Sequence, residues 1–212
     1  MTKKAPKGGV KKADSYHHGD LRAALIEAGF AMLKKEGAHQ LSLREVARRV
    51  GVSHMAPYRH FPDKEALLAA IAQTGFEKLG KKVSAAIAAE EKSPLAQMEA
   101  AAVAYVRFAL EDTEHIKVMF GGFISDRTKY PATREAAMSN FEMILGILSS
   151  CQSQGLVRKM PVEQQALAAW SAVHGIAMLL VENQLQFLDI DAKQAEEVSR
   201  FVARTVLAGL KA

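Results

Sequence analysis

Hydrophobic residues recur along this chain with the three-to-four-residue spacing of α-helices, and no run shows the alternation typical of strands. The first apolar face lies between Asp20, a candidate N-cap, and Gly37, a candidate helix stop, and consists of Leu21, Leu25, Ala28 and Met32. Because helix-favouring residues dominate the composition, we predict an all-α fold. Breaks at Pro, Gly and Asp predict later helices over 63–89, 95–111, 115–120, 133–154, 162–187 and 191–210.

A short amphipathic helix is predicted directly after Ser42. Ser42 and Glu45 have the spacing of a capping box, in which the hydroxyl accepts from the third amide and the glutamate reaches back to the cap. The helix that follows is about two turns long and has one buried stripe, made of Leu43, Val46, Ala47 and Val50.

A glycine turn and a polar second segment follow this helix. Gly51 supplies the turn, Ser53 is the expected N-cap of a helix over 54–60, and Asp63 is the expected N-cap of the long helix 63–89. A bracing helix, a turn and a second helix rich in hydrogen-bonding side chains form the helix-turn-helix pattern, which places the second helix in the major groove of DNA.

The positive charge of the chain is concentrated around this motif. Residues 1–64 contain 13 Lys/Arg and 6 Asp/Glu, whereas residues 65–212 contain 15 and 17. A basic solvated tail is the alternative explanation, since five lysines lie in the first twelve residues, but 22–64 alone keeps a net charge of +4. We therefore predict a disordered basic arm (1–16), a DNA-binding domain (17–64) and an effector-binding and dimerisation domain (65–212).

Other classes of protein find little support in the sequence. There is no GxGxxG after a strand, no P-loop, no GxSxG elbow and only one cysteine, Cys151, so we expect no enzyme, no catalytic residue and no cofactor. His17 and His18 with Asp20 are a weak metal motif on a flexible arm, and no metal is expected. The basic N-terminus lacks an apolar signal region and the apolar run 170–181 is too short to span a bilayer, so we predict a cytoplasmic protein without membrane contact.

The predicted helix 162–187 is apolar on two faces. One face carries Leu167, Trp170, His174, Met178 and Val181, and the other carries Ala166, Ala169, Val173, Ile176 and Leu180. A helix that is apolar nearly all round needs partners on two sides. Together with the wide apolar stripe of 191–210, it predicts a homodimer through a four-helix bundle, the alternative being a central core helix in a monomer.

These motifs resemble the TetR family of bacterial transcriptional repressors. The resemblance rests on the helix before the motif, on SLREVARRVGVS (42–53) and on YRHFPDKEALL (58–68), and it covers about residues 17–75. Trp170 with His174 and Gly175 is similar to one C-terminal subgroup of that family. The resemblance implies an all-α homodimer that binds double-stranded operator DNA with its N-terminal domain and usually a small inducer with its C-terminal domain.

One position departs from the family pattern. Pro57 stands where most members have Leu, Ile or Phe before the tyrosine. Proline costs only a hydrogen bond near the start of a helix, but it can open the first turn and alter the base contacts.

The family pattern assigns the DNA contacts to both segments of the motif. The hydroxyl and amides at the first helix start would meet a phosphate, Arg44 would read a guanine edge, and the first turn of the second segment would contact bases. The expected DNA-binding residues are Ser42, Leu43, Arg44, Ser53, His54, Met55, Ala56, Tyr58, His60 and Lys64. Arg44 as a solvated residue, Tyr58 as a core aromatic and His60 as a packing residue are the alternatives; Arg48 and Arg49 are expected in solvent or in intraprotein pairs.

The C-terminal domain is expected to bind an unidentified apolar or amphipathic small-molecule effector. Candidate lining residues are Phe108, Met119, Phe120, Phe123, Met143, Ile147, Trp170, His174 and Met178. Each is also a normal core residue, and His174 bonded to a core partner is the stronger interpretation of that residue. The helix 63–89 is the expected lever between effector and DNA. A DNA-binding protein without an inducer is the alternative function.

Overall fold

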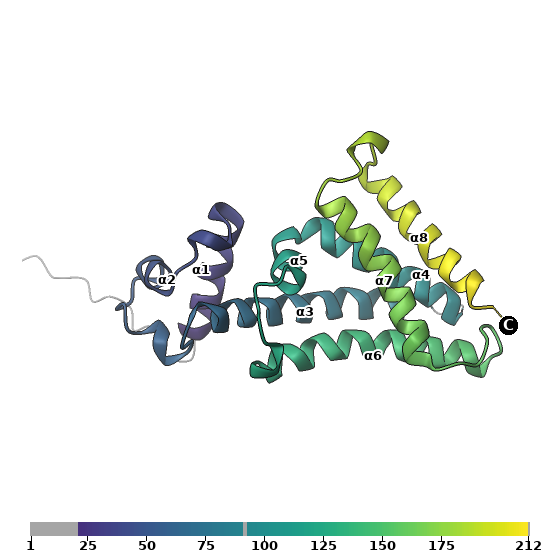
Figure 1. Ribbon diagram of the computed structural model, residues 1–212, viewed down its shortest axis with the longest axis horizontal. Coiled ribbons are helices and arrows are strands. Elements are labelled where there is room, and N and C mark those ends of the chain that lie inside the picture. The colour runs from purple at the N-terminus through teal and green to yellow at the C-terminus, as the bar shows by residue number, and fades with distance from the viewer. Residues whose placement is uncertain (1–20, 91–92, 212) are drawn as a thin grey trace, which may run out of the picture.

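The computed structural model describes residues 21–90 and 93–211, so Asp20, the basic arm and the histidine pair lie outside the described residues (Figure 1). The described part contains eight α-helices and no strand, which confirms the predicted all-α fold. The α-helices are α1 (Leu21–Glu36), α2 (Leu43–Val50), α3 (Lys64–Ala88), α4 (Pro94–Glu111), α5 (Thr113–Phe120), α6 (Pro131–Ser153), α7 (Val162–Val181) and α8 (Ala192–Gly209). Short 3-10 helices are η1 (Ala38–Gln40), η2 (Pro57–Arg59), η3 (Arg127–Lys129) and η4 (Gln186–Leu188).

The helices form a small N-terminal unit and a larger body joined by α3. Figure 1 shows α1 and α2 at one end of the molecule, with α3 running from that unit into the body. In the body, α3 packs against α4, α5 and α6, while α7 and α8 pack against α4 and against each other. Since α3 belongs to both parts, it is the main physical connection between them.

Local hydrogen bonds explain where the helices begin. The Asp63 carboxylate accepts from the amide of Ala66 at 2.8 Å, and the Ser93 and Asp191 side chains accept from the third following amide in the same way. Helix α1 ends at Glu36, and Gly37 adopts a left-handed φ of +77° that favours glycine. The prediction of a helix stop at Gly37 is therefore confirmed.

Helix α7 is shorter than predicted. It ends at Val181, not at residue 187, because Asn183 adopts a left-handed φ of 56°. The amide of Gln184 donates to the carbonyl of Leu179 at 2.8 Å, and the amide of Asn183 donates to Leu180 at 3.1 Å. These two bonds form a Schellman motif, which satisfies the last carbonyls and turns the chain away before η4.

The largest apolar core runs without interruption from the N-terminal unit into the body. Leu25 and Met32 of α1, Ile71 of α3 and Ile116 of α5 are fully buried members of it. A second cluster, around Leu148, lies at the far end of α6 between α7 and α8. The continuity of the first cluster ties the position of α1 to that of α5.

Candidate nucleic-acid interface and ligand cavity

The first helix of the motif is held as the sequence predicts, with one difference at its start. The Ser42 hydroxyl accepts from the amide of Glu45 at 3.2 Å, but the Glu45 carboxylate does not return to the cap. It accepts instead from Arg48 and Arg49, at 2.6 and 3.2 Å, because both guanidinium groups lie one turn further along the same face. These hydrogen bonds lower the pKa of Glu45 to about 2.

Because they form these ion pairs, Arg48 and Arg49 are not free to bind phosphate. Arg49 also contacts the carboxylate of Glu36 at 2.5 Å, which ties α2 to the end of α1. The expectation that Arg48 and Arg49 lie in solvent or in intraprotein pairs is confirmed, and the pairs brace the motif.

The second segment of the motif is not the α-helix predicted over 54–60. It consists of turns followed by η2, and its backbone bonds span three residues, as from the amide of Ala56 to the carbonyl of Ser53 at 3.0 Å. Pro57 lacks the amide that would continue an α-helix, and its buried ring anchors the segment in the core. The Ser53 side chain does not cap the segment, which corrects that prediction.

Four of the predicted DNA-contact residues surround one surface hollow. Arg44 of α2 and His54, Met55 and Tyr58 of the second segment line a concavity of about 340 Å³. Met55 is 70% exposed and Tyr58 42% exposed, so neither side chain is committed to the core. The fold thus brings Arg44 together with residues ten or more positions later.

The other predicted contacts are not part of the lining of this hollow and lie in different settings. Ser53 is exposed, while Ala56 and Lys64 are half-buried. The Leu43 side chain is buried, which leaves only its backbone amide available. The half-buried His60 ring lies 6.3 Å from the ring of Phe61, in keeping with the packing alternative.

Sequence analysis missed a further cation in the second segment. Arg59 is exposed, and neither it nor Arg44 forms an ion pair within residues 21–90 and 93–211. The position of Arg59 directly after Tyr58, a predicted contact, could have identified it from the sequence. Arg44 lines the hollow, and Arg59 and Lys64 are further cations that follow Tyr58 closely in the chain.

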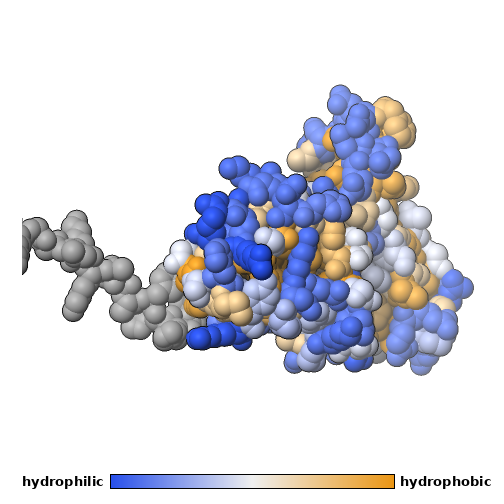
Figure 2. Space-filling model, turned by 60° about the vertical axis from the view of Figure 1, so that its left-hand side comes forward, coloured by the Kyte–Doolittle hydropathy of each residue, from blue (hydrophilic) through white to orange (hydrophobic). Residues whose placement is uncertain are grey.

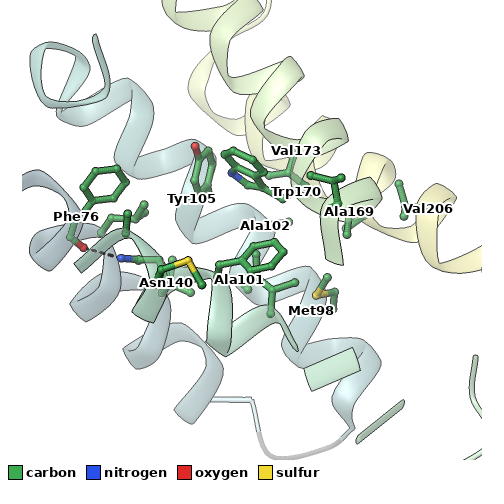
Figure 3. Close-up of a pocket in the computed structure, with 18 of the residues that line it drawn as sticks. Phe76, Met98, Ala101, Ala102, Tyr105, Asn140, Ala169, Trp170, Val173 and Val206 are labelled. Carbon is green, nitrogen blue, oxygen red and sulfur yellow. Dashed lines mark hydrogen bonds between the residues drawn. The ribbon is translucent and has the colours of Figure 1, made fainter. Parts of the chain in front are cut away.

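The body contains an apolar cavity of about 310 Å³ that is open to the surface (Figure 3). Its walls come from α3, α4, α6, α7 and α8, with Phe120 of α5 and Arg127 of η3 completing them. Figure 3 shows Tyr105 and Trp170 beside each other on one wall, with Ala101 and Ala102 nearby. Its size matches the lower range of small-molecule sites.

Only two of the nine predicted effector residues line this cavity, Phe120 and Trp170. The others are turned elsewhere, because the relative rotation of the packed helices decides which face meets the cavity. Phe108 and Met119 fill the main core, Ile147 fills the second cluster, Met143 and Met178 pack against the main core, Phe123 lies 37% exposed at the surface, and His174 lies against Trp170 and Phe120.

His174 has a polar partner inside the protein. Its Nδ1 is hydrogen-bonded to the Tyr105 hydroxyl at 2.8 Å, which confirms a core partner as the role of this histidine. Burial lowers the pKa of His174 and raises the pKa of Tyr105, so both groups are neutral near pH 7. Tyr105, Arg127 and Asn140 are cavity residues that sequence analysis missed, since single polar positions on helices carry no pattern.

Two family models cover most of the described chain. Residues 25–71, which include the motif, match the model for bacterial regulatory proteins of the tetR family. Residues 98–205, just over half of the chain, match the tetracyclin repressor-like C-terminal domain.

The chain belongs to the TetR family.

It is therefore a DNA-binding transcriptional regulator with a helix-turn-helix domain followed by a helical C-terminal domain. Regulators of this family bind operator DNA, dimerise and bind small-molecule effectors, and they are typically not enzymes.

Solved structures extend the likeness over nearly the whole chain. A protein of unknown function from Rhodococcus sp. RHA1 is 34% identical, with a TM-score of 0.81 over 94% of this chain and 100% of that one. FadR from Bacillus subtilis, solved in complex with stearoyl-CoA, is 15% identical, with a TM-score of 0.72 over 89% and 98% of the two chains. The second likeness shows the fold alone.

A curated relative matches a shorter stretch. The nucleoid occlusion factor SlmA of Alteromonas mediterranea is 34% identical over 82 residues, which are 37% of this chain and 40% of that protein.

Helix α7 has a second property besides its place in the cavity wall. Among the described residues it is the one helix long and apolar enough to cross a membrane, yet only 22% of its most apolar window is buried within the chain. Its inner side packs in the core through Ala166, Ala169, Val173 and Ala177. Its opposite side is exposed at Leu167 and Leu179.

Proposed function

We propose that this regulator is a cytoplasmic homodimeric repressor, which binds a near-palindromic operator and leaves it when an apolar or amphipathic ligand fills the cavity. The observation that carries the proposal is the joint presence of a cationic hollow at one end of α3 and a ligand-sized apolar cavity beside its other half. Each part alone fits many proteins, whereas the pair joined by one helix fits a ligand-controlled regulator.

At the DNA, the hollow divides the contacts into two kinds. Arg44 offers a planar guanidinium to a guanine edge, and the exposed Met55 offers an apolar contact to a thymine methyl group. Tyr58 lines the hollow, and Arg59 and Lys64 follow it in the chain; all three are suited to phosphate oxygens, which fix the register of the protein on the duplex.

The dimer is proposed to form through α7 and α8. Leu167 and Leu179 on α7 are 52% and 44% exposed, and Phe201 on α8 is 68% exposed. Between the two leucines, Ala168, Ser171 and Gly175 follow one another at helical spacing and are also exposed, so a second helix can approach closely. A bundle of four helices buries this surface, and no membrane is needed to explain it.

The connection between α7 and α8 extends the apolar surface. Phe187 and Leu188 of η4 are 79% and 54% exposed. Figure 2 shows hydrophobic surface at the top of the molecule, where Figure 1 places this connection. We propose that it belongs to the same subunit interface.

Control by ligand requires that the cavity and the DNA-binding unit move together. Phe76 and Leu79 of α3 line the cavity, and the same helix begins at Lys64, six positions after Tyr58 of the hollow. A ligand that favours a different tilt of α3 changes the separation of the two hollows in the dimer, which must match the spacing of the half-sites.

The proposal is tested by DNA footprinting and by sedimentation of the full chain. We expect protection of a two-fold symmetric site in the DNA that flanks its own gene, and a dimer in solution. Phe201→Arg is expected to give a monomer that no longer protects the site, while Phe123→Arg, at an exposed aromatic residue in the segment after α5, is expected to leave both unchanged. A monomeric wild-type protein, or protection by Phe201→Arg equal to wild type, would refute the dimer.

The proposed release by a ligand is tested on the same footprinted DNA. Thermal-shift screening of apolar and amphipathic metabolites identifies binders, and each binder is then added to the footprint. Loss of protection supports the proposal, whereas a screen in which no binder alters the footprint favours a regulator without an inducer.

A further inference from the structure

Five helices of the body each bring one aromatic ring to the wall of the ligand cavity. The rings are Phe76 of α3, Tyr105 of α4, Phe120 of α5, Phe141 of α6 and Trp170 of α7. Phe120, Phe141 and Trp170 are only half-buried, so part of each ring is not covered by protein. A ligand in the cavity therefore meets aromatic side chains from five helices.

Four of these rings follow one another along the wall. The Phe120 centroid lies 5.5 Å from that of Phe76 and 6.0 Å from that of Trp170. The Phe141 centroid lies 6.4 Å from that of Trp170. The pairs Phe76–Phe120 and Phe141–Trp170 are T-shaped, with interplanar angles of 81° and 75°. The wall thus presents both faces and edges of rings, and a further ring can meet them edge-to-face or offset-stacked, which are the preferred arrangements.

The polar side chains of the wall are already engaged within the protein. The Tyr105 hydroxyl is hydrogen-bonded to His174 Nδ1 at 2.8 Å, and Figure 3 shows the Trp170 indole beside this tyrosine. The Asn140 Nδ2 donates to backbone carbonyls of α3 and α6, and its Oδ1 is buried out of reach of a ligand. A polar ligand group would give up its water here without gaining a partner, which is unfavourable.

Arg127 is the one charged residue of the lining, and it does not form a buried anion site. Its side chain is exposed to solvent, and its guanidinium donates a hydrogen bond to the backbone carbonyl of Met119. A charged ligand in the apolar interior would lose its hydration without a buried counter-charge. The cavity therefore favours an uncharged ligand.

The size of the cavity suits more than one ring. Its volume of about 310 Å³ is twice the roughly 150 Å³ of an apolar protein cavity that holds one benzene. Met98 and Met138 also line it, and thioethers are favourable neighbours of aromatic rings. Two or three fused rings match this space.

We infer that the cavity takes an uncharged, flat aromatic compound of two or three fused rings. This inference rests on the proposed function, because it names the ligand class of the same cavity. The five rings of the wall account for the aromatic character of the ligand, and the engaged polar groups account for its lack of charge. An alkyl chain would also be buried here, but it would not gain the contacts between rings.

Dye displacement from the full chain tests the inference. The dye is N-phenyl-1-naphthylamine, itself an uncharged aromatic compound, and its binding is followed by energy transfer from Trp170, the only tryptophan of the chain. Competitors are naphthalene with its saturated counterpart decalin, methyl 2-naphthoate with the free 2-naphthoate, and decanoate. We expect naphthalene to bind about fivefold more tightly than decalin, although decalin is the more hydrophobic. The ester is expected to bind at least about tenfold more tightly than the carboxylate.

Variants assign the preference to the rings of the wall. Phe141→Leu keeps an apolar side chain, so it is expected to lower the preference for naphthalene over decalin about threefold. Unchanged decalin affinity shows that the cavity is intact, and Phe120→Leu repeats the test on a second helix. Phe123→Leu, at an exposed phenylalanine outside the lining, is the matched control and is expected to leave the preference unchanged. Arg127→Gln is expected to change the affinity of neither the ester nor the carboxylate.

Several results would overturn the inference. They are decalin or decanoate bound as tightly as naphthalene, the carboxylate bound as tightly as its ester, a full aromatic preference in both Phe141→Leu and Phe120→Leu, and no binding of the dye. The proposed function is judged separately by the footprint. An aromatic compound that binds with these preferences and leaves the footprint intact would support the ligand class and count against release by ligand.

Discussion

The ring of Phe30, on α1 of the DNA-binding unit, is stacked on the imidazole of His115, on α5 of the body. Their centroids are 3.7 Å apart, with 24° between the ring planes. Helix α5 ends at Phe120, which lines the ligand cavity. One short helix, α5, therefore contacts the cavity at its end and the DNA-binding unit near its start. It is a second connection, besides α3, between the cavity and the DNA-binding unit.

The stack predicts an energetic coupling between the two units. In a double-mutant cycle of Phe30→Ala and His115→Ala, measured by urea unfolding, we expect a coupling free energy of about 0.5–1.5 kcal/mol. The pair Phe30→Ala and Ile147→Ala is the control, because Ile147 lies in the second apolar cluster and its effect is expected to add. If the effects of Phe30→Ala and His115→Ala on the free energy of unfolding are additive, the stack does not contribute to stability.

The same histidine predicts a pH dependence of stability. Burial lowers the pKa of His115, the positive charges of Lys78 and Lys34 lower it further, and Asp112 opposes them. The folded protein therefore holds a neutral imidazole, while the unfolded chain takes up a proton below about pH 6.5. The free energy of unfolding is expected to fall as the pH drops through this range, by at most about 1.4 kcal/mol per pH unit from His115.

Urea unfolding of wild type and His115→Gln between pH 8 and pH 5 checks this sign. The variant is expected to show a shallower dependence, and a His174→Gln variant gives the contribution of the second buried histidine, whose pKa burial also lowers. Stability that rises on acidification in wild type would contradict the assignment.

The division of DNA contacts predicts different effects for three cations. Arg44→Ala is expected to weaken operator binding by about 1–3 kcal/mol and random DNA little, because Arg44 reads bases. Lys64→Ala is expected to weaken both and to make the salt dependence shallower, because it contacts phosphate. Arg48→Ala is the control, since its guanidinium is already bound to Glu45. Fluorescence anisotropy on both duplexes at several salt concentrations separates these outcomes, and equal losses from Arg44→Ala on the two duplexes would contradict base reading.

A glycine in α3 predicts a packing effect close to the same junction. A Cβ at Gly75 would stand 2.6 Å from Met119 Sδ and 3.1 Å from His115 Cδ2, so Gly75→Ala is expected to destabilise the protein by about 1–3 kcal/mol. At Gly146, within α6, nothing lies within 4 Å of the added atom, and Gly146→Ala is expected to stabilise by about 0.5–1 kcal/mol. Thermal unfolding of both variants tests the pair; shifts of equal sign would show that helix propensity decides both.

Local signals made most of the fold predictable. The serine and aspartate caps, the stop at Gly37 and the apolar periodicity act within a few residues, so the helix boundaries followed from the sequence, as at Asp63. The end of α7 at Val181 was not predicted, because nothing in the residues around Asn183 indicates its left-handed conformation. The second segment of the motif was expected to be an α-helix, and Pro57 was noted but its effect underestimated.

The candidate sites were predictable to unequal degrees. The hollow around Arg44 was found because its residues belong to one continuous motif. The cavity was largely missed, since its lining depends on how five helices are rotated against one another, and Met98 or Ala102 looks like any core residue in the sequence. Its aromatic rings lie on five separate helices, so only the fold shows that they share one wall.

The central claim is that two copies of the hollow read DNA together. Selection of bound duplexes from a random-sequence pool by the full chain, followed by sequencing, tests it most directly. We predict enrichment of an inverted repeat whose half-site centres are separated by about one helical turn or a multiple of it. A consensus without two-fold symmetry, or a pool that shows no enrichment, would contradict the account.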